Sequence, residues 1–331
     1  MIPIDCSVDF SQSLAISMKQ FLLPYLICPA CLPAETPLEV RVNQMKADDI
    51  ITGELSCKKC RRRFPIKNGI AILLSESNDY RAVGQLRYEE STMTDRYLWS
   101  HYGDLLGLDD YGDAHTHWAA ALSCHPSLPS FDAGCAVGRL TFEMAVRSSF
   151  AVGCDLSHGF VKAARRLARD GEMTFSLPQE GNLRESFTLT LPESLRSDTI
   201  EFVVADALRI PFAANSFSQV ASLNLLDRVS YPLAHLFEMS RVADNENASF
   251  LFADPFSWSP DVTPEEFWLG GTTTGPYQGR GLDNVRSILE GKGNILKPAW
   301  SISRSGTIPW NMRTHCNHCE VIRSQYLVAA R

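Results

Sequence analysis

From about residue 129 onward, short apolar runs alternate with segments of helical periodicity, and this alternation constrains the fold more than any other feature. Such a pattern is typical of a parallel β-sheet that is covered by helices on both faces. The predicted strands are 128–133, 150–154, 200–205, 219–224 and 248–253. Two extended segments, 295–304 and 321–329, are expected to close the sheet as a hairpin. The sequence therefore predicts an α/β fold.

One helix can be placed in detail, after the second predicted strand. Ser157 is expected to cap its N-terminus, and the apolar residues that follow recur at helical spacing. The opposite face would carry Lys162, Arg165, Arg166 and Arg169. This basic face could contact RNA, but we expect it to be solvated.

The segment FDAGCAVGRL, residues 131–140, forms a glycine-containing turn between the first strand and a helix. Dinucleotide-binding turns place backbone amides against a pyrophosphate, but here only Gly134 and Gly138 are present, and Cys135 follows the first of them. Asp132 stands at the end of the strand, where a carboxylate would repel a pyrophosphate and attract an ammonium group. The turn therefore predicts a nucleoside with a positive amino-acid tail, S-adenosylmethionine.

Three further strand ends carry polar side chains that suit the same ligand. Asp155, followed by Leu156, could accept from both ribose hydroxyls, and Asp206 could accept from the adenine amino group while Ala207 lines the ring. Asn224 ends the fourth strand. Each residue alone could be a turn or cap residue, but open α/β sheets bind ligands at the edge where these strand ends meet.

These motifs resemble those of the class I S-adenosylmethionine-dependent methyltransferases. The resemblance rests on FDAGCAVGRL, on GCDLS and on VVADALRIPFAANSFSQVASLNLLDRV. One departure is ADNENA, residues 243–248, which stands where many members have a Pro-Gly-Gly turn. The resemblance implies a Rossmann-like, seven-stranded sheet and an enzyme that transfers methyl groups.

Four of the ten cysteines form two Cys-x-x-Cys pairs, CPAC and CKKC. Cys28, Cys31, Cys57 and Cys60 supply the tetrahedral sulfur set of a structural zinc site, with free cysteines or a thiol–disulfide pair as the alternatives. With the following RRRFPIKNGIAILL, the segment resembles the small Trm112-like zinc ribbons. We expect an N-terminal extension (1–24), a zinc ribbon (25–75), a helical cap for the substrate (76–128) and a methyltransferase domain (129–331).

Charge and composition limit the partners of this 331-residue chain. The net charge of -7 argues against a generally basic surface, so nucleic acid is an unlikely partner, although KKCRRRF on the ribbon is locally basic. The N-terminus shows neither a signal peptide nor a membrane span, and the paired cysteines suit metal ligation, so we expect a cytoplasmic protein. Two roles of the ribbon are possible: it could dock a protein partner, or it could clamp the methyltransferase domain of the same chain.

The acceptor pocket is predicted from residues that follow strand ends or precede the sheet. The candidates are Tyr88, His101, Asp227, Arg228, Trp258 and Trp268, and among the histidines His101 is favoured as a proton acceptor near neutral pH. An Asn/Asp-Pro-Pro-Tyr/Phe motif is typical of enzymes that methylate amino groups of nucleic-acid bases. No such motif follows the fourth strand, which weakens the hypothesis that the chain methylates bases. HYGD, NLLDRV, DPFSW and WLGG also resemble the mercaptohistidine N-methyltransferase domain of ovothiol biosynthesis.

That narrower resemblance implies a small imidazole or thiol acceptor that is methylated on nitrogen or sulfur. Two alternatives are an RNA or protein methyltransferase guided by the ribbon, and a catalytically idle scaffold that keeps the cofactor fold. The segment HCNHC adds His315, Cys316, His318 and Cys319, which could bind a metal or a soft substrate.

Overall fold

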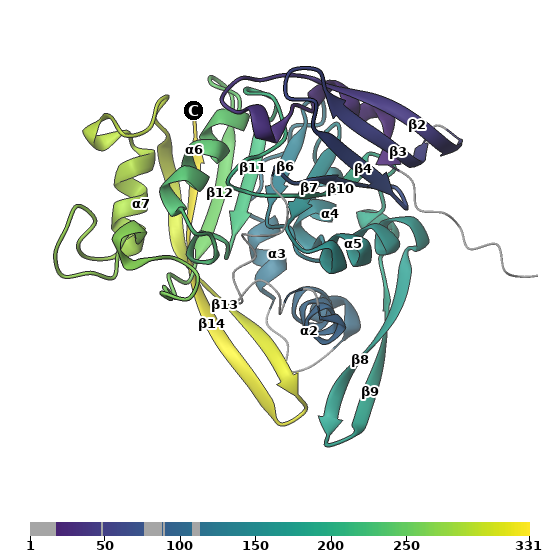
Figure 1. The fold of residues 1–331 in the computed structure, drawn as a ribbon. Coiled ribbons are helices and arrows are strands. Elements are labelled where there is room, and N and C mark those ends of the chain that lie inside the picture. Colours follow the sequence, from purple (N-terminus) through teal and green to yellow (C-terminus); the bar gives the residue numbers. More distant parts are fainter. Residues whose placement is uncertain (1–17, 48, 76–87, 89, 108–112) are drawn as a thin grey trace, which may run out of the picture.

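The computed structural model describes residues 18–47, 49–75, 88, 90–107 and 113–331 (Figure 1). Five strands of the predicted sheet are parallel: β6 (Ser130–Ala133), β7 (Ala151–Asp155), β10 (Ile200–Ala205), β11 (Gln219–Leu223) and β12 (Ser249–Asp254). Strand β14 (His318–Ala330) pairs antiparallel with β12 and with β13 (Ser301–His315). The order β10-β7-β6-β11-β12-β14-β13 confirms the Rossmann-like, seven-stranded sheet.

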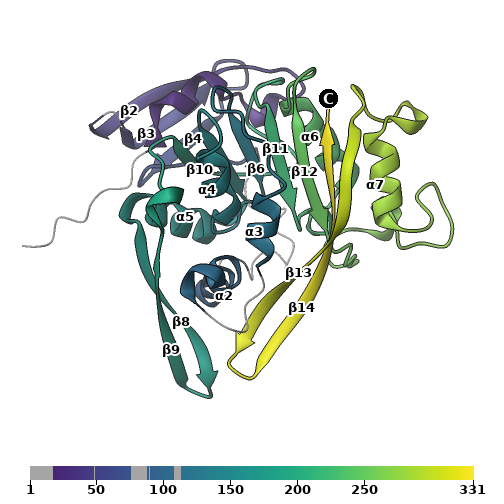
Figure 2. The ribbon, with the colours of Figure 1, turned by 180° about the vertical axis from the view of Figure 1, so that it is seen from behind.

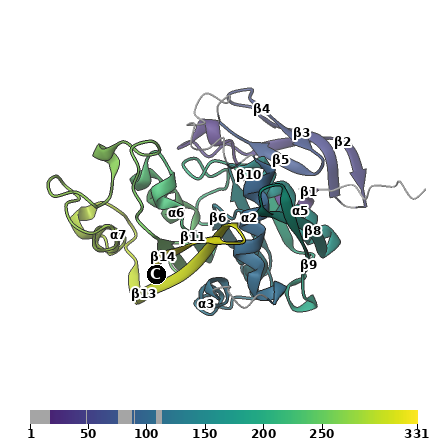
Figure 3. The same cartoon turned by 90° about the horizontal axis from the view of Figure 1, so that it is seen from below.

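Helices cover both faces of this sheet because successive residues of each strand point to opposite sides. In β12, Phe250 and Phe252 belong to one core, whereas Leu251 and Ala253 belong to the other. The first core includes α6 (Pro232–Val242) and α7 (Gly281–Leu289), and the second includes α2 (Ser91–Tyr102), α3 (Ala114–Ala119), α4 (Arg139–Ala145) and α5 (His158–Asp170). Viewed from below, α3 and α6 lie on opposite sides of the central strands (Figure 3).

The ribbon is joined to the same sheet. Its strands are β1 (Met18–Lys19), β2 (Leu38–Lys46), β3 (Asp49–Cys57), β4 (Arg63–Lys67) and β5 (Ile70–Leu73), and β5 pairs in parallel with β10. The result is one sheet of twelve strands among the described residues. Strand β1 lies within the predicted extension 1–24, of which residues 1–17 are outside the described part of the chain.

Short 3-10 helices connect these elements. They are η1 (Gln20–Tyr25), η2 (Pro29–Cys31), η4 (Gly103–Leu106), η5 (Glu193–Leu195), η6 (Leu226–Arg228), η7 (Glu265–Phe267) and η8 (Lys292–Asn294). Of these, η2 lies in the first cysteine knuckle and η6 follows the C-terminal end of β11. Both therefore contain predicted site residues: Cys31 in η2, and Asp227 and Arg228 in η6.

A second hairpin was not predicted from the sequence. Strands β8 (Glu172–Glu180) and β9 (Leu183–Thr190) project beyond the sheet beside the long β13–β14 hairpin, with α2 between the two (Figure 2). Arg313 Nη2 lies 2.8 Å from Glu185 Oε2, and Cys316 Sγ donates to the Gln179 carbonyl at 2.7 Å. The two hairpins are therefore in contact near their tips.

Helix α5 confirms one prediction and corrects another. The Ser157 hydroxyl accepts a hydrogen bond from the Phe160 amide at 3.2 Å, so Ser157 is the N-cap. Arg165, however, is buried and forms an ion pair with Glu201 of β10. The expectation that its side chain is solvated was wrong, because Glu201 offers a buried partner that lies on a distant strand.

Candidate functional site

A cavity of about 520 Å³ opens at the carboxyl ends of the parallel strands. Its walls combine the ends of β6, β7, β10 and β11 with residues of the cap segment. Of the predicted site residues, the cavity is lined by Tyr88, His101, Asp132, Gly134, Cys135, Asp155, Leu156, Asp206, Ala207, Asn224 and Arg228. The sheet thus brings the strand-end residues together at one edge, as expected for an open α/β sheet.

The glycine turn forms the floor of this cavity. Gly134 has φ +70°, and a Cβ atom there would lie 2.9 Å from Leu225 Cδ2, so both conformation and space favour glycine. Asp132 is buried and accepts a hydrogen bond from the Thr141 hydroxyl at 2.7 Å. Gly138, in contrast, is not in the cavity wall; its φ is +85°, and a Cβ atom would lie 2.7 Å from Phe202 Cζ. Its place in the turn is explained by packing.

Asp155 is held in place by the backbone on both sides. Its Oδ2 accepts from the Ala136 amide at 3.0 Å, and its Oδ1 accepts from the Ser157 amide at 2.9 Å. A carboxylate oxygen has two lone pairs, so an oxygen that accepts from a backbone amide can also accept from a ligand hydroxyl. Asp155 therefore links the glycine turn to the start of α5 and fits a diol.

The loop after β10 is positioned by a histidine that sequence reasoning missed. Asp206 Oδ1 accepts from the Leu208 amide at 2.8 Å. The buried His235 ring of α6 contacts the Ala207 carbonyl through Nδ1 at 3.1 Å and Ser222 Oγ through Nε2 at 2.8 Å. Burial lowers the pKa of His235 to about 4, so a neutral ring donates from Nδ1 and accepts at Nε2.

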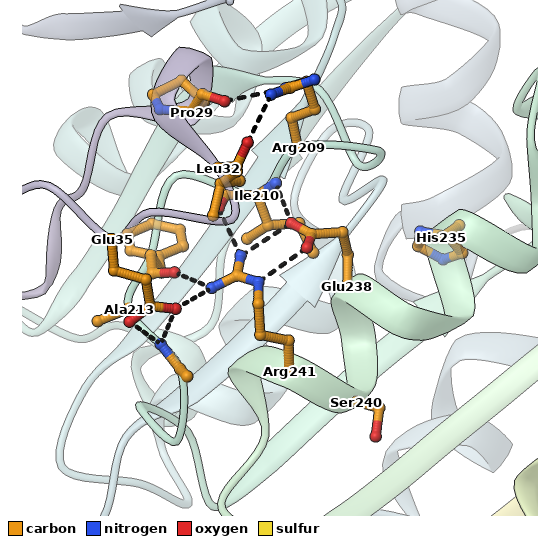
Figure 4. Close-up of polar contacts among 12 residues, drawn as sticks. Pro29, Leu32, Glu35, Arg209, Ile210, Ala213, His235, Glu238, Ser240 and Arg241 are labelled. Carbon is orange, nitrogen blue, oxygen red and sulfur yellow. Dashed lines mark hydrogen bonds and ion pairs between the residues drawn. The ribbon is translucent and has the colours of Figure 1, made fainter. Parts of the chain in front are cut away.

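The first cysteine knuckle contacts the same loop. Arg209 lines the cavity, and its Nε and Nη2 atoms donate to the carbonyls of Pro29 and Leu32 at 2.9 and 3.2 Å (Figure 4). The backbone adds a bond from the Ile27 amide to the Pro211 carbonyl at 3.0 Å. The ribbon therefore fixes one end of the loop that carries Asp206.

A second arginine joins the ribbon to α6. Arg241 forms ion pairs with Glu35 at 2.9 Å and with Glu238 at 2.7 Å (Figure 4). Its terminal nitrogens also donate to the carbonyls of Ile210 and Phe212 at 2.8 and 2.7 Å. This face of the ribbon therefore contacts the chain's own methyltransferase domain.

The cap contributes an aromatic wall. Tyr88, Tyr97, His101, His115 and Trp118 line the cavity, and the rings of His101 and His115 lie 4.3 Å apart. Burial and the positive charge of Arg139 lower the pKa of His101 to about 3. The lowered pKa makes the imidazole a weak base, which does not favour the prediction that His101 accepts a proton near neutral pH.

Three of the predicted pocket residues do not line the cavity. Asp227 is fully buried behind it and pairs with Arg228, whose Nε lies 3.2 Å from Asp227 Oδ1. Trp258 and Trp268 stack on each other at 6.1 Å in the segment after β12. These three side chains support the wall and do not form it.

The four cysteines predicted as metal ligands converge. Cys28 Sγ lies 3.6 Å from Cys60 Sγ, Cys31 Sγ lies 3.7 Å from Cys57 Sγ, and all four sulfurs lie within 4.8 Å of one another. Four thiolates about 2.3 Å from a tetrahedral zinc ion would be separated by roughly 3.8 Å. The cysteine set therefore fits a structural zinc ion.

The HCNHC segment lies elsewhere. His315, Cys316, His318 and Cys319 are exposed at the turn between β13 and β14. Within the described ranges, the ribbon cysteines are the only group of three or more candidate ligands that could hold a metal ion. The turn therefore gives no support to a second metal centre.

Comparisons with known proteins bear on both modules. Residues 19–69 match the family model described as Trm112p-like protein, and residues 131–248 match the one described as methyltransferase domain. No curated protein has a matching sequence. The first matched segment includes strands β2, β3 and β4 of the ribbon, and the second includes strands β7, β10 and β11 of the sheet that carries the cavity.

Solved structures with a similar fold include three methyltransferase-related chains. Magnesium protoporphyrin IX methyltransferase from Synechocystis PCC 6803 with bound SAM is 20% identical, with 74% of this chain and 94% of that chain covered and a TM-score of 0.44. A complex that contains the Haloferax volcanii Trm112 methyltransferase activator gives 14% identity, coverages of 71% and 92%, and a TM-score of 0.43. A SAM-dependent methyltransferase from Aquifex aeolicus is 15% identical, with 72% of this chain and 98% of that chain covered and a TM-score of 0.39.

The domain matches and the site geometry define the class of protein. The chain is an enzyme with a methyltransferase domain, as predicted. It carries a Trm112p-like module with a four-cysteine zinc site at its N-terminal side. In the described parts of the chain, none of the helices has the length and apolar character needed to cross a membrane.

Proposed function

We propose that this enzyme methylates a ring nitrogen or a sulfur atom of a small imidazole or thiol metabolite. The observation that carries the proposal is that the chain's own cap contributes to the wall of the cavity. Five cap residues line a cavity of about 520 Å³ together with the strand ends: Tyr88, Tyr97, His101, His115 and Trp118. This volume falls in the range of small-molecule sites, and it must receive the cofactor as well.

In the proposed reaction, the strand-end aspartates bind the cofactor and the cap binds the acceptor. Bound S-adenosylmethionine supplies an electrophilic methyl group, and the transfer needs a nucleophile held close and in line. The carboxylates of Asp132, Asp155 and Asp206 would bind the cofactor's ammonium, ribose and adenine groups. The aromatic cap would orient the acceptor and exclude water. A thiolate or a neutral imidazole attacks through its own lone pair, so the weak basicity of His101 is no obstacle.

The narrower resemblance to the mercaptohistidine N-methyltransferase domain supports an imidazole or thiol acceptor. Its motifs HYGD and NLLDRV contribute His101 and Arg228 to the cavity wall. A cytoplasmic location stays a prediction from the sequence.

A second candidate function is methylation of RNA or protein, which the Trm112p-like module and the exposed basic residues beside it favour. Arg61, Arg62 and Arg63 lie on the ribbon, outside the cavity wall. Reversing their charges to Glu should leave turnover of a small acceptor unchanged. Loss of activity on a macromolecule, with cofactor binding intact, would instead favour this second function.

The protonation of Asp132 gives a prediction about cofactor affinity. Burial, together with the charge of Asp155, raises the pKa of Asp132 to about 7, although the Thr141 hydrogen bond opposes the shift. A raised folded-state pKa means that Asp132 stabilises the cofactor-free fold at low pH, and that this contribution is lost between about pH 4 and 7. A cationic ligand favours the charged carboxylate.

Binding of S-adenosylmethionine should therefore tighten by roughly tenfold between pH 5.5 and 7, a range in which the ligand ammonium stays protonated. Calorimetry across this range measures the affinity and the accompanying proton release. Asp132→Asn is the matched control and should bind weakly with no pH dependence. Affinity of the unmodified enzyme that does not change with pH would contradict the role of Asp132.

A further inference from the structure

Arg228 places a positive charge in a cavity whose wall also carries the carboxyl groups of Asp132, Asp155 and Asp206. It ends η6, just beyond the C-terminal end of β11, and lines the cavity with a side chain that is 30% exposed. Its electrostatic neighbours include Tyr88 and Tyr97 of the cap. Arg228 therefore lies where the cap meets the sheet edge.

The guanidinium is held from behind by Asp227. The Arg228 Nε atom lies 3.2 Å from Asp227 Oδ1, and the Ser257 amide donates to Asp227 Oδ2 at 2.7 Å. The Asp227 amide in turn donates to Asp254 Oδ2 at 3.3 Å. Because Asp227 is fully buried and fixed by the backbone, it fixes the orientation of the arginine.

The terminal nitrogens of Arg228 are unused in the described structure. Asp227 is the only described residue that forms an ion pair or hydrogen bond with this guanidinium, and it takes the Nε atom. The cavity's other arginine, Arg209, differs because its Nε and Nη2 atoms donate to the ribbon carbonyls. A guanidinium with a free edge presents two parallel N–H groups that match a carboxylate.

We infer that Arg228 binds a carboxylate group of the methyl acceptor, so that the acceptor is a small carboxylic acid. This inference rests on the proposed function and narrows its substrate class. The carboxylate would lie against the free guanidinium edge, and the aromatic cap would cover the remainder of the acceptor. The cofactor also contains a carboxylate, and the experiment below separates the two sources.

The test uses probe pairs that differ in one carboxylate: L-histidine with histamine, and L-cysteine with cysteamine. Full-length enzyme saturated with S-adenosylhomocysteine is titrated with each probe by calorimetry. We expect at least one acid to bind tenfold or more tightly than its amine partner. Arg228→Met should abolish this preference for the acid. Arg228→Lys keeps the positive charge but lacks the paired N–H donors of the guanidinium, so it should retain part of the preference. Arg323→Met, at an exposed position on β14, is the matched control.

Affinity for S-adenosylmethionine, measured on the same proteins, separates the outcomes. It should stay within twofold of the unmodified enzyme in all variants. A tenfold loss in Arg228→Met would assign the arginine to the cofactor's carboxylate and overturn the inference. Equal binding of both members of each pair, or binding of neither, would also overturn it while leaving the methyltransferase assignment intact. Only failure of the unmodified enzyme to bind S-adenosylmethionine would count against the proposed function itself.

Discussion

Loss of zinc is expected to destabilise the methyltransferase domain together with the ribbon. Leu22 and Leu26 of the ribbon share one buried core with Phe131 and Phe212 of the domain. Strand β5 also continues the sheet beside β10. Structural zinc sites contribute on the order of 10 kcal/mol to folding of their modules. A loss of only about 5 kcal/mol would lower the melting temperature by roughly 10 °C or more in a protein of this size.

The measurement is thermal unfolding of the enzyme before and after chelation, and of Cys57→Ser. Cys124→Ser is the matched control, because Cys124 is exposed and lies outside the ribbon. We expect a single transition that moves down in Cys57→Ser and after chelation, and stays in place in the control. Two separate transitions, with the larger one unchanged, would show that the ribbon and the domain are energetically independent.

Replacing Asp155 by Ala should lower the affinity for S-adenosylmethionine by at least about a hundredfold. The change removes charged acceptors for two ribose hydroxyls, and each such hydrogen bond contributes about 1.5–3 kcal/mol. It also releases the Ala136 and Ser157 amides, which the carboxylate now holds at 3.0 and 2.9 Å.

Calorimetry on Asp155→Ala measures this effect, and Asp198→Ala is a matched control at an exposed position. Asp155→Asn keeps the size of the side chain and one acceptor oxygen, so its affinity should fall between the two. Circular dichroism confirms that each variant is folded. Unchanged affinity of a folded Asp155→Ala protein would contradict the assignment of the ribose site.

The features predicted correctly from the sequence are those that local patterns determine. The Ser157 cap and the parallel strands depend on neighbouring residues, and the ends of parallel strands necessarily share one edge. The convergence of Asp132, Asp155 and Asp206 at the cavity follows from that geometry.

Features that depend on distant partners could not be predicted. Arg165 of α5 is buried because it pairs with Glu201 of β10. The ribbon extends the sheet because β5 pairs in parallel with β10. His115 and Trp118 reach the cavity only through the placement of α3. The β8–β9 hairpin differs, because the sequence itself carries a strand signal there: the apolar residues Met173, Phe175 and Leu177 alternate with Thr174 and Ser176.

The most direct test of the central claim is a turnover assay that follows release of S-adenosylhomocysteine from purified, zinc-loaded enzyme. The acceptors are imidazole thiols, simple thiols and their carboxylated forms, with RNA and protein as separate arms. We predict turnover with a small imidazole or thiol that is unaffected by reversing the charges of Arg61, Arg62 and Arg63. Turnover with RNA or protein alone, lost on that charge reversal, would contradict the account.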